Sequence, residues 1–191
     1  MAGWMTKIFS NRADYTAFAS SASEGSLLAG LNLQPVIPAL SMNESAFSRT
    51  FSLLARGVVS NTGTPTIIFQ VRSGTTSGST YLSGTSVGVS AAITTSSGIT
   101  NKWWELRLDL TCNTPGIGSN TTVSGAGYVA SPGAFASPFV YALEPTTPDT
   151  ATWTATIDES LTQYINLSVT WSASSSSNTI TCKQLMAWWV D

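Results

Sequence analysis

The chain has 191 residues, of which 42% are hydrophobic and only 9% are charged, against about a quarter charged in ordinary soluble domains. Ser and Thr instead make up roughly three residues in ten. This length is enough for one well-filled core, and the net charge of −2 gives no electrostatic basis for binding nucleic acid. No apolar run approaches the eighteen or so residues of a membrane span, and the N-terminus does not resemble a secretory signal. We therefore expect a protein made in the cytoplasm, without a membrane or nucleic-acid partner.

Residues 1–25 differ from the rest and are predicted to form a short N-terminal arm, ahead of a β-domain over residues 26–191. Apolar side chains in this segment line one side of a short helix that begins near Ser10. The arm is either a frayed terminus or a segment that docks on a partner or a neighbouring subunit, because large apolar side chains are costly to leave in water. The candidate contact residues are Trp4, Ile8, Phe9, Tyr15 and Phe18.

Alternation of apolar and polar residues predicts β-strands along the rest of the chain. Over residues 103–112 the apolar side chains point one way and the charged ones the other, which is typical of a half-buried antiparallel strand. The same period occurs over 152–158 and 164–172. Further strands are predicted at 28–32, 36–41, 51–59, 66–72, 81–92, 122–130, 138–143 and 179–190.

Turn signals rich in Gly, Pro and Asn separate these runs, and helical periodicity is nearly absent. Together they predict an all-β fold, a jelly roll or β-sandwich of about eight to ten antiparallel strands. In the last strand the apolar set changes face after Cys182, to Leu185 and Ala187. This change of face indicates a β-bulge near residues 183–184.

The sequence offers little for catalysis. Histidine is absent, which removes the commonest general base and metal ligand, and two cysteines without histidine cannot build a zinc site. Glu105 and Asp109 share a strand face about 13 Å apart, whereas glycosidase carboxylates lie about 5 to 9.5 Å apart. With Arg107 between them, they are interpreted as a solvated charge ladder. We expect no catalytic residue, metal or cofactor.

Two cysteines, Cys112 and Cys182, each fall in an apolar strand pattern. For a protein that stays in the cytoplasm, buried thiols are favoured over a disulfide.

Adjacent tryptophans occur at 103–104 and at 188–189. In each pair one ring should enter the core while the other faces outward. An outward ring either packs under strand ends and loops, anchors a protein interface, or stacks on a sugar. Of the two surface roles we favour the protein interface, because no cluster of Asn, Asp and Arg accompanies the rings. Trp103 and Trp189 are the candidate subunit-interface aromatics.

Several short motifs resemble a group of small virion proteins from tailed phages. The likeness extends in patches over residues 24–183, and the terminus MAWWVD departs from it. The motifs are EGSLL at 24–28, ARGVVS at 55–60, TGTPTI at 62–67, AAIT at 91–94, WEL at 104–106, VTWSAS at 169–174 and NTIT at 178–181.

The resemblance implies a jelly-roll protein of the phage particle, commonly trimeric and often a decoration or cement protein on the outside of the head. Its partners would be the major capsid protein and further copies of itself, and it would need no cofactor. We therefore expect a homotrimer that bridges capsid subunits on the outer capsid surface. The alternatives are a tail, fibre or head-fibre component that binds host-surface glycans, a hydrolase with carboxylates from separate strands, and a free-standing carbohydrate-binding module.

Overall fold

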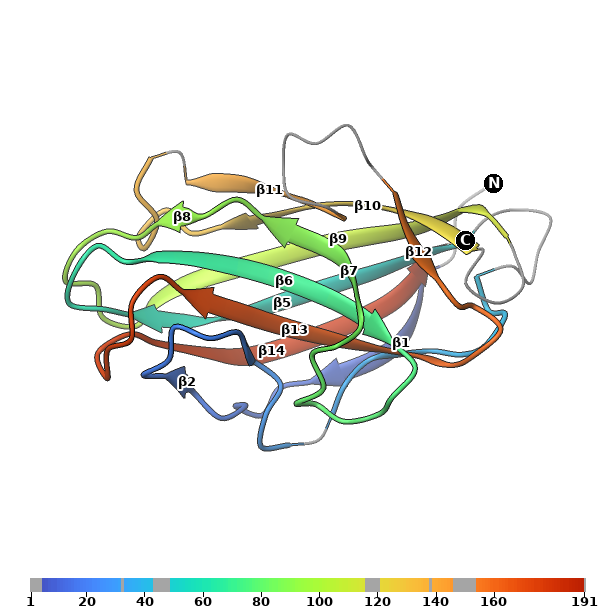
Figure 1. Cartoon of the computed structure of the whole chain (residues 1–191), viewed down its shortest axis with the longest axis horizontal. Coiled ribbons are helices and arrows are strands. Elements are labelled where there is room, and N and C mark those ends of the chain that lie inside the picture. The colour runs from blue at the N-terminus through green and yellow to red at the C-terminus, as the bar shows by residue number, and fades with distance from the viewer. Residues whose placement is uncertain are drawn as a thin grey trace.

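The computed structural model describes residues 5–31, 33–42, 49–115, 121–137, 139–145 and 154–190. Within these ranges the chain forms strands and no helix, so no helix long and apolar enough to cross a membrane occurs there (Figure 1). The strands are β1 (Met5–Asn11), β2 (Phe18–Ala19), β3 (Gly25–Ser26), β4 (Val36–Ile37), β5 (Thr50–Ser60), β6 (Thr66–Gly74), β7 (Thr85–Ser90), β8 (Ile93–Thr94), β9 (Lys102–Thr114), β10 (Thr121–Ala130), β11 (Val140–Glu144), β12 (Thr154–Ile157), β13 (Gln163–Trp171) and β14 (Thr179–Val190).

The strands form one antiparallel sheet that folds into two facing layers (Figure 1). One layer has the order β1-β14-β5-β9-β10 and the other β7-β6-β13-β3, while β11 pairs with both β10 and β7 and joins the layers. The pairs β5·β14, β6·β13, β7·β11 and β9·β10 are nested along the chain. Such nesting arises when a long hairpin folds over on itself, as in a jelly roll. The predicted β-sandwich is confirmed.

The core lies between the two layers and follows the predicted alternation. Every inward residue of β9 is buried, and the Trp104 ring meets Phe69 of the opposite layer at 5.2 Å between ring centroids. Each large side chain buried in this way stabilises the fold by about 1.5 to 3 kcal/mol. The inward residues of the three central strands are Trp104, Leu106, Leu108, Leu110 and Cys112 in β9, Ile67, Phe69 and Val71 in β6, and Ile165, Leu167, Val169 and Trp171 in β13.

The predicted β-bulge in the last strand is confirmed. The register between β14 and β5 shifts between Cys182 and Gln184, which leaves Lys183 as the extra residue. Gly57 stands opposite Cys182, and a Cβ atom added to it would lie 1.9 Å from the carbonyl oxygen of Thr181. Glycine is therefore needed at this position because the two backbones approach so closely.

The helix predicted near Ser10 is wrong. β1 pairs with β14, the backbone N–H of Tyr15 donates to the Cys182 carbonyl at 3.0 Å, and β2 pairs with the start of β14. The N-terminal segment thus follows β14 along its whole length. The unpaired backbone groups of a sheet edge give more hydrogen bonds than a short, marginal helix in water.

The alternation in β13 predicts that its outward polar side chains are solvated, but two of them are buried. Asn166 and Ser168 are buried beneath β3 and the β6–β7 connection, and Ser168 donates a hydrogen bond to Glu24 at 2.5 Å. Arg72 binds both carboxylate oxygens of Glu24, each at 2.8 Å. Burial by itself raises the pKa of Glu24, but the bonds from Arg72 and Ser168 and the Arg72 charge outweigh it and hold the pKa below 4.5.

Three other predicted strands changed. A turn over residues 27–31 follows β3 in place of the strand predicted at 28–32, the strand predicted at 36–41 is confined to β4, and the strand predicted at 81–92 is confined to β7. Trp153, in the strand predicted at 152–158, lies outside the described residues. Cys112 and Cys182 are both buried free thiols, as predicted, and burial raises the pKa of Cys182 to about 12.

Candidate functional site

The predicted contact arm keeps an exposed part, which is strand β1. All of its side chains from Met5 to Ile8 are exposed, with Met5 67% and Ile8 36% accessible, while Phe9 packs partly against the core. Ile8 sits at a shift in the pairing register with β14, between Lys7 and Phe9. β1 is therefore held to β14 by backbone pairing, while its apolar side chains Met5 and Ile8 remain exposed to solvent. Trp4 lies outside the described residues.

The rest of the predicted arm belongs to the core. Tyr15 is buried, its hydroxyl donates to the Leu33 carbonyl at 3.0 Å, and burial raises its pKa to about 12. Phe18 is partly buried and packs over Gly25, where an added Cβ atom would lie 2.0 Å from the ring. Neither ring is presented to a partner, so the accessible contact surface of the arm narrows to residues 5–9.

One ring of each tryptophan pair enters the core, as predicted. Trp104 is fully buried and Trp103 is 51% exposed. In the second pair Trp189 is buried edge-on against Phe51, with ring centroids 5.7 Å apart, and Trp188 faces outward. Trp189, named as an interface candidate, is therefore a core residue. Trp103 is exposed and remains a candidate interface residue.

Hydrogen bonds of Ser131 connect the backbone of Trp103 to a segment with two more exposed apolar residues. The Ser131 hydroxyl donates to the Trp103 carbonyl, and the Ser131 N–H donates to the Phe139 carbonyl at 3.0 Å. Val140 follows directly and pairs with Ala130. We call Trp103, Phe139 and Val140 the Trp103 patch. All three are about half exposed.

The outer face of β14, β5 and β9 mixes apolar and charged side chains. Leu54 lies between Met186 and Arg107 in the register, and the Arg107 guanidinium stands 6.0 Å from the Trp188 ring. One row further on, Arg56 binds Glu105 at 2.7 Å. The charged groups on this face are thus already paired within the protein.

The carboxylates predicted to form a charge ladder do so. Arg107 contacts Asp109 at 3.6 Å, while Glu105 accepts hydrogen bonds from Arg56 and from the Tyr128 hydroxyl. Burial raises the pKa of Glu105, but these bonds and the arginine charges outweigh it and lower the pKa below 4.5. Among the described residues, no three Cys, Asp or Glu side chains come together in a way that would hold a metal ion.

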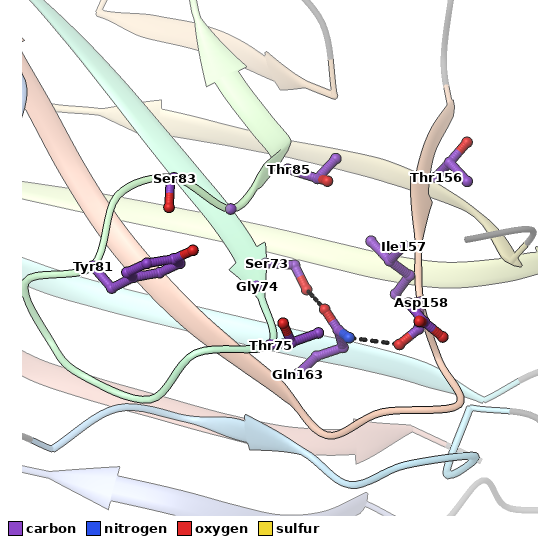
Figure 2. A pocket seen from close by; sticks show the side chains of 11 residues that line it. Ser73, Gly74, Thr75, Tyr81, Ser83, Thr85, Thr156, Ile157, Asp158 and Gln163 are labelled. Carbon is purple, nitrogen blue, oxygen red and sulfur yellow. Dashed lines mark hydrogen bonds between the residues drawn. The ribbon is translucent and has the colours of Figure 1, made fainter. Parts of the chain in front are cut away.

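A polar pocket of about 200 Å³ opens at the end of the sandwich where β6 turns into β7. Figure 2 shows Tyr81 on one side, Thr156, Ile157 and Asp158 on the other, and Ser73 and Gln163 between them. Thr75, Ser83 and Thr85 add exposed hydroxyl groups to the lining. Asp158 is the one charged side chain among the lining residues.

Buried hydrogen bonds fix the floor of this pocket. Gln163 is buried, accepts a bond from Ser73 at 2.9 Å, and donates to the carbonyls of Asp158 at 2.6 Å and Leu161 at 3.2 Å (Figure 2). Its amide group is therefore fully engaged. Asp158 accepts from the backbone and hydroxyl of Ser160 through Oδ1. No hydrogen bond within the described structure uses its second oxygen, Oδ2.

A side chain of β13 holds the Tyr81 wall of the pocket. Asn166 is buried and donates to the carbonyls of Ser79 at 2.8 Å and Tyr81 at 2.9 Å. The ring of Tyr81 lies close to Gly74, where an added Cβ atom would stand 3.5 Å from it. Hydrogen bonds with Ser83 and Thr76 lower the pKa of Tyr81. The ring is thus held in place although it is exposed.

A second hollow of about 440 Å³ lies nearby and is less polar. Its lining is Leu33, Gln34, Val36, Ser77, Gly78 and Tyr164. It contains no charged side chain, so it offers a ligand fewer directed contacts than the first pocket.

The polar pocket could not be predicted from the sequence. Its residues come from segments about 70 positions apart, and Asp158 is the last residue of the strand predicted at 152–158. Asn166, which holds one wall of the pocket, stands at an outward position of the predicted strand at 164–172, so the alternation does not indicate that it is buried.

No protein-family model matches the chain, and no curated protein matches it. Among solved structures the chain is similar to the CBM2 module of the evolved Dit of Lactobacillus casei BL23 phage J-1. That similarity has a TM-score of 0.38 and 11% sequence identity, and it covers 100% of this chain and 98% of the other. A likeness at this level assigns neither a fold nor a function.

Proposed function

We propose that this chain is a structural virion protein that decorates and cements the outside of a tailed-phage icosahedral head, as a homotrimer that bridges major capsid subunits. The sequence motifs that resemble such proteins support the setting. They fall on framework positions of the sandwich, including ARGVVS in β5, WEL in β9 and NTIT at the start of β14. A shared framework of this kind is expected between proteins with a common scaffold.

The observation that carries the proposal is the exposure of β1. A strand held to the sheet edge by its backbone normally buries one face, but Met5 and Ile8 leave large apolar side chains in water. An exposed edge strand also offers its free backbone groups to a neighbouring chain. We assign this strand to the capsid contact and the Trp103 patch to the contact between copies.

A structural role rather than an enzymatic one also fits the state of the acidic residues. Glu24, Glu105 and Asp109 lie in ion pairs with arginine, and Asp14 pairs with Lys183. Groups engaged in this way have lost the freedom that a general acid or base needs.

Binding to heads that lack the protein tests the capsid contact. The double variant Met5→Ser, Ile8→Ser should sediment with such heads at least about tenfold less than the wild type, because two exposed apolar anchors are lost. Leu161→Ser is the matched control, since Leu161 is also an exposed apolar side chain, at 50%, but belongs to the β12–β13 turn and not to β1. Equal binding by the double variant and the control would contradict the assignment.

Light scattering tests the contact between copies. The wild type should have the mass of a trimer, and Trp103→Ser should shift it toward the monomer of 20.1 kDa. A monomeric wild type at micromolar concentration would refute the homotrimer.

A tail, fibre or head-fibre component that binds host glycans is the second candidate, favoured by the half-exposed ring of Trp103. Glycan-array binding that Trp103→Ala abolishes, together with undiminished sedimentation of the Met5→Ser, Ile8→Ser protein, would select this candidate.

A further inference from the structure

The polar pocket beside Tyr81 combines features that neither the capsid contact nor the contact between copies uses. It lies on the β6–β7 connection, the end of β12 and the start of β13, whereas β1 is at the far edge of the other layer. β12 pairs with the start of β10 and Val140 of the Trp103 patch pairs with its last residue, Ala130, so the pocket and the patch lie toward opposite ends of that strand. The geometry points to a binding site for one neutral sugar unit, with the Tyr81 ring as a stacking wall and Asp158 as the hydrogen-bond acceptor. This inference does not depend on where the chain sits in a phage particle.

The chemistry of the lining selects the class of ligand. Most side chains around the rim carry hydroxyl groups, which both donate and accept hydrogen bonds. The single charge, on Asp158, is negative, so phosphates and acidic sugars would be repelled. A neutral polyhydroxy compound matches both properties, because its hydroxyl groups donate to a carboxylate and exchange bonds with Ser and Thr.

Two groups in the pocket are free to meet such a ligand. Oδ2 of Asp158 receives no hydrogen bond from the described residues, whereas Oδ1 is held by Ser160. The side chain of Tyr81 is 39% exposed and lies across the pocket from the β12 wall (Figure 2). An exposed aromatic ring and a carboxylate on two sides of one pocket let the apolar face of a pyranose pack on the ring while its hydroxyl groups bond to the carboxylate.

The pocket is already built before a ligand enters. Asn166 fixes the backbone on both sides of the Tyr81 turn, and the amide of Gln163 fixes the Asp158 side. A Cβ atom on Gly84 would lie 2.4 Å from the Ser73 carbonyl, so the two sides of the connection pass in close contact. A preformed site avoids the ordering cost that weakens binding by flexible loops.

The volume limits the ligand to one sugar unit. About 200 Å³ is less than the roughly 300 to 1,000 Å³ of sites for drug-sized molecules. A ligand with about a dozen heavy atoms and ordinary binding efficiency would have a Kd on the order of 1 mM. Copies joined in an oligomer would bind a surface bearing many such units far more tightly.

NMR titration of the full chain with the methyl glycosides of glucose, galactose, N-acetylglucosamine and rhamnose tests the site. At least one of them should shift the amide signals of residues 81–85 and 156–158 in a saturable way. Tyr81→Ala and Asp158→Asn should each raise the Kd by about tenfold. Asn keeps the Oδ1 acceptor for Ser160, so Asp158→Asn is expected to leave the turn folded.

Two controls make the outcome specific. Tyr81→Phe should bind within about threefold of the wild type, because the ring face remains. Tyr164→Ala, in the neighbouring hollow, should leave the Kd unchanged, and a thermal melt of each variant shows that it is folded. The proposal is overturned if none of the four sugars gives saturable shifts, if the shifts persist in both pocket variants, or if inorganic phosphate binds there and the sugars do not.

Discussion

Replacing Gly57 with alanine tests the packing of β5 against the bulged strand β14. The added Cβ atom would stand 1.9 Å from the Thr181 carbonyl oxygen and 2.9 Å from the Trp104 ring, whereas contacts below 3.0 Å force a shift. The backbones of two paired central strands would have to separate by about 1 Å, and overpacking on this scale costs about 3 kcal/mol. For a chain of this length, that corresponds to a fall in Tm of about 6 to 12 °C.

Differential scanning calorimetry at one fixed protein concentration measures this effect. Gly63→Ala is the matched control, because its added Cβ atom would meet only Pro65, at 3.9 Å. That change should leave the Tm within about 2 °C of the wild type or raise it slightly, since alanine restricts the unfolded chain. If Gly57→Ala also melts within about 2 °C of the wild type, the register of β5 and β14 at the bulge is wrong.

Three further predictions concern charge, thiols and the tryptophan pair. Although burial opposes it, the ion pair of Glu24 holds its pKa below 4.5, so its stabilising effect is present above that pH and is lost on acidification below it. The wild type should therefore have a higher urea midpoint than Glu24→Gln at about pH 7, and this difference should disappear by about pH 3. A difference that stays constant over this range would contradict the prediction. Cys112 and Cys182 should react with a thiol reagent only after unfolding, because both are buried and burial raises the pKa of each; mass spectrometry that finds a disulfide or native labelling would refute this. In urea titrations Trp104→Ala should lower the free energy of unfolding by about 3 to 5 kcal/mol and Trp103→Ala by less than about 0.5 kcal/mol. The reverse order would mean that β9 turns its other face toward the core.

The period of the central strands could be predicted because their side chains alternate between core and surface. The bulge in β14 was also visible, since the apolar set changes face at Lys183. That same change places Trp189 on the inward face with Leu185 and Ala187, so naming Trp189 as an interface residue disagreed with the predicted bulge. Following the register to the end of the strand would have assigned Trp188 to the outside.

Other features depend on contacts between distant segments. Asn166 alternates as an outward residue, and only the β6–β7 connection, more than 80 positions earlier, buries it and gives its amide two acceptors. The N-terminal segment has a helical apolar pattern, but the open edge of β14 pairs with it instead. Neither the pocket nor the strand β1 follows from local pattern, because tertiary pairing decides both.

The copy number of this protein relative to the major capsid protein, measured by quantitative mass spectrometry on purified particles, tests the central claim most directly. A decoration protein that covers the shell should be present at a ratio of the same order as the capsid protein. A handful of copies per particle would move it to the tail, a fibre or a vertex, and complete absence from the particles would contradict the virion assignment itself.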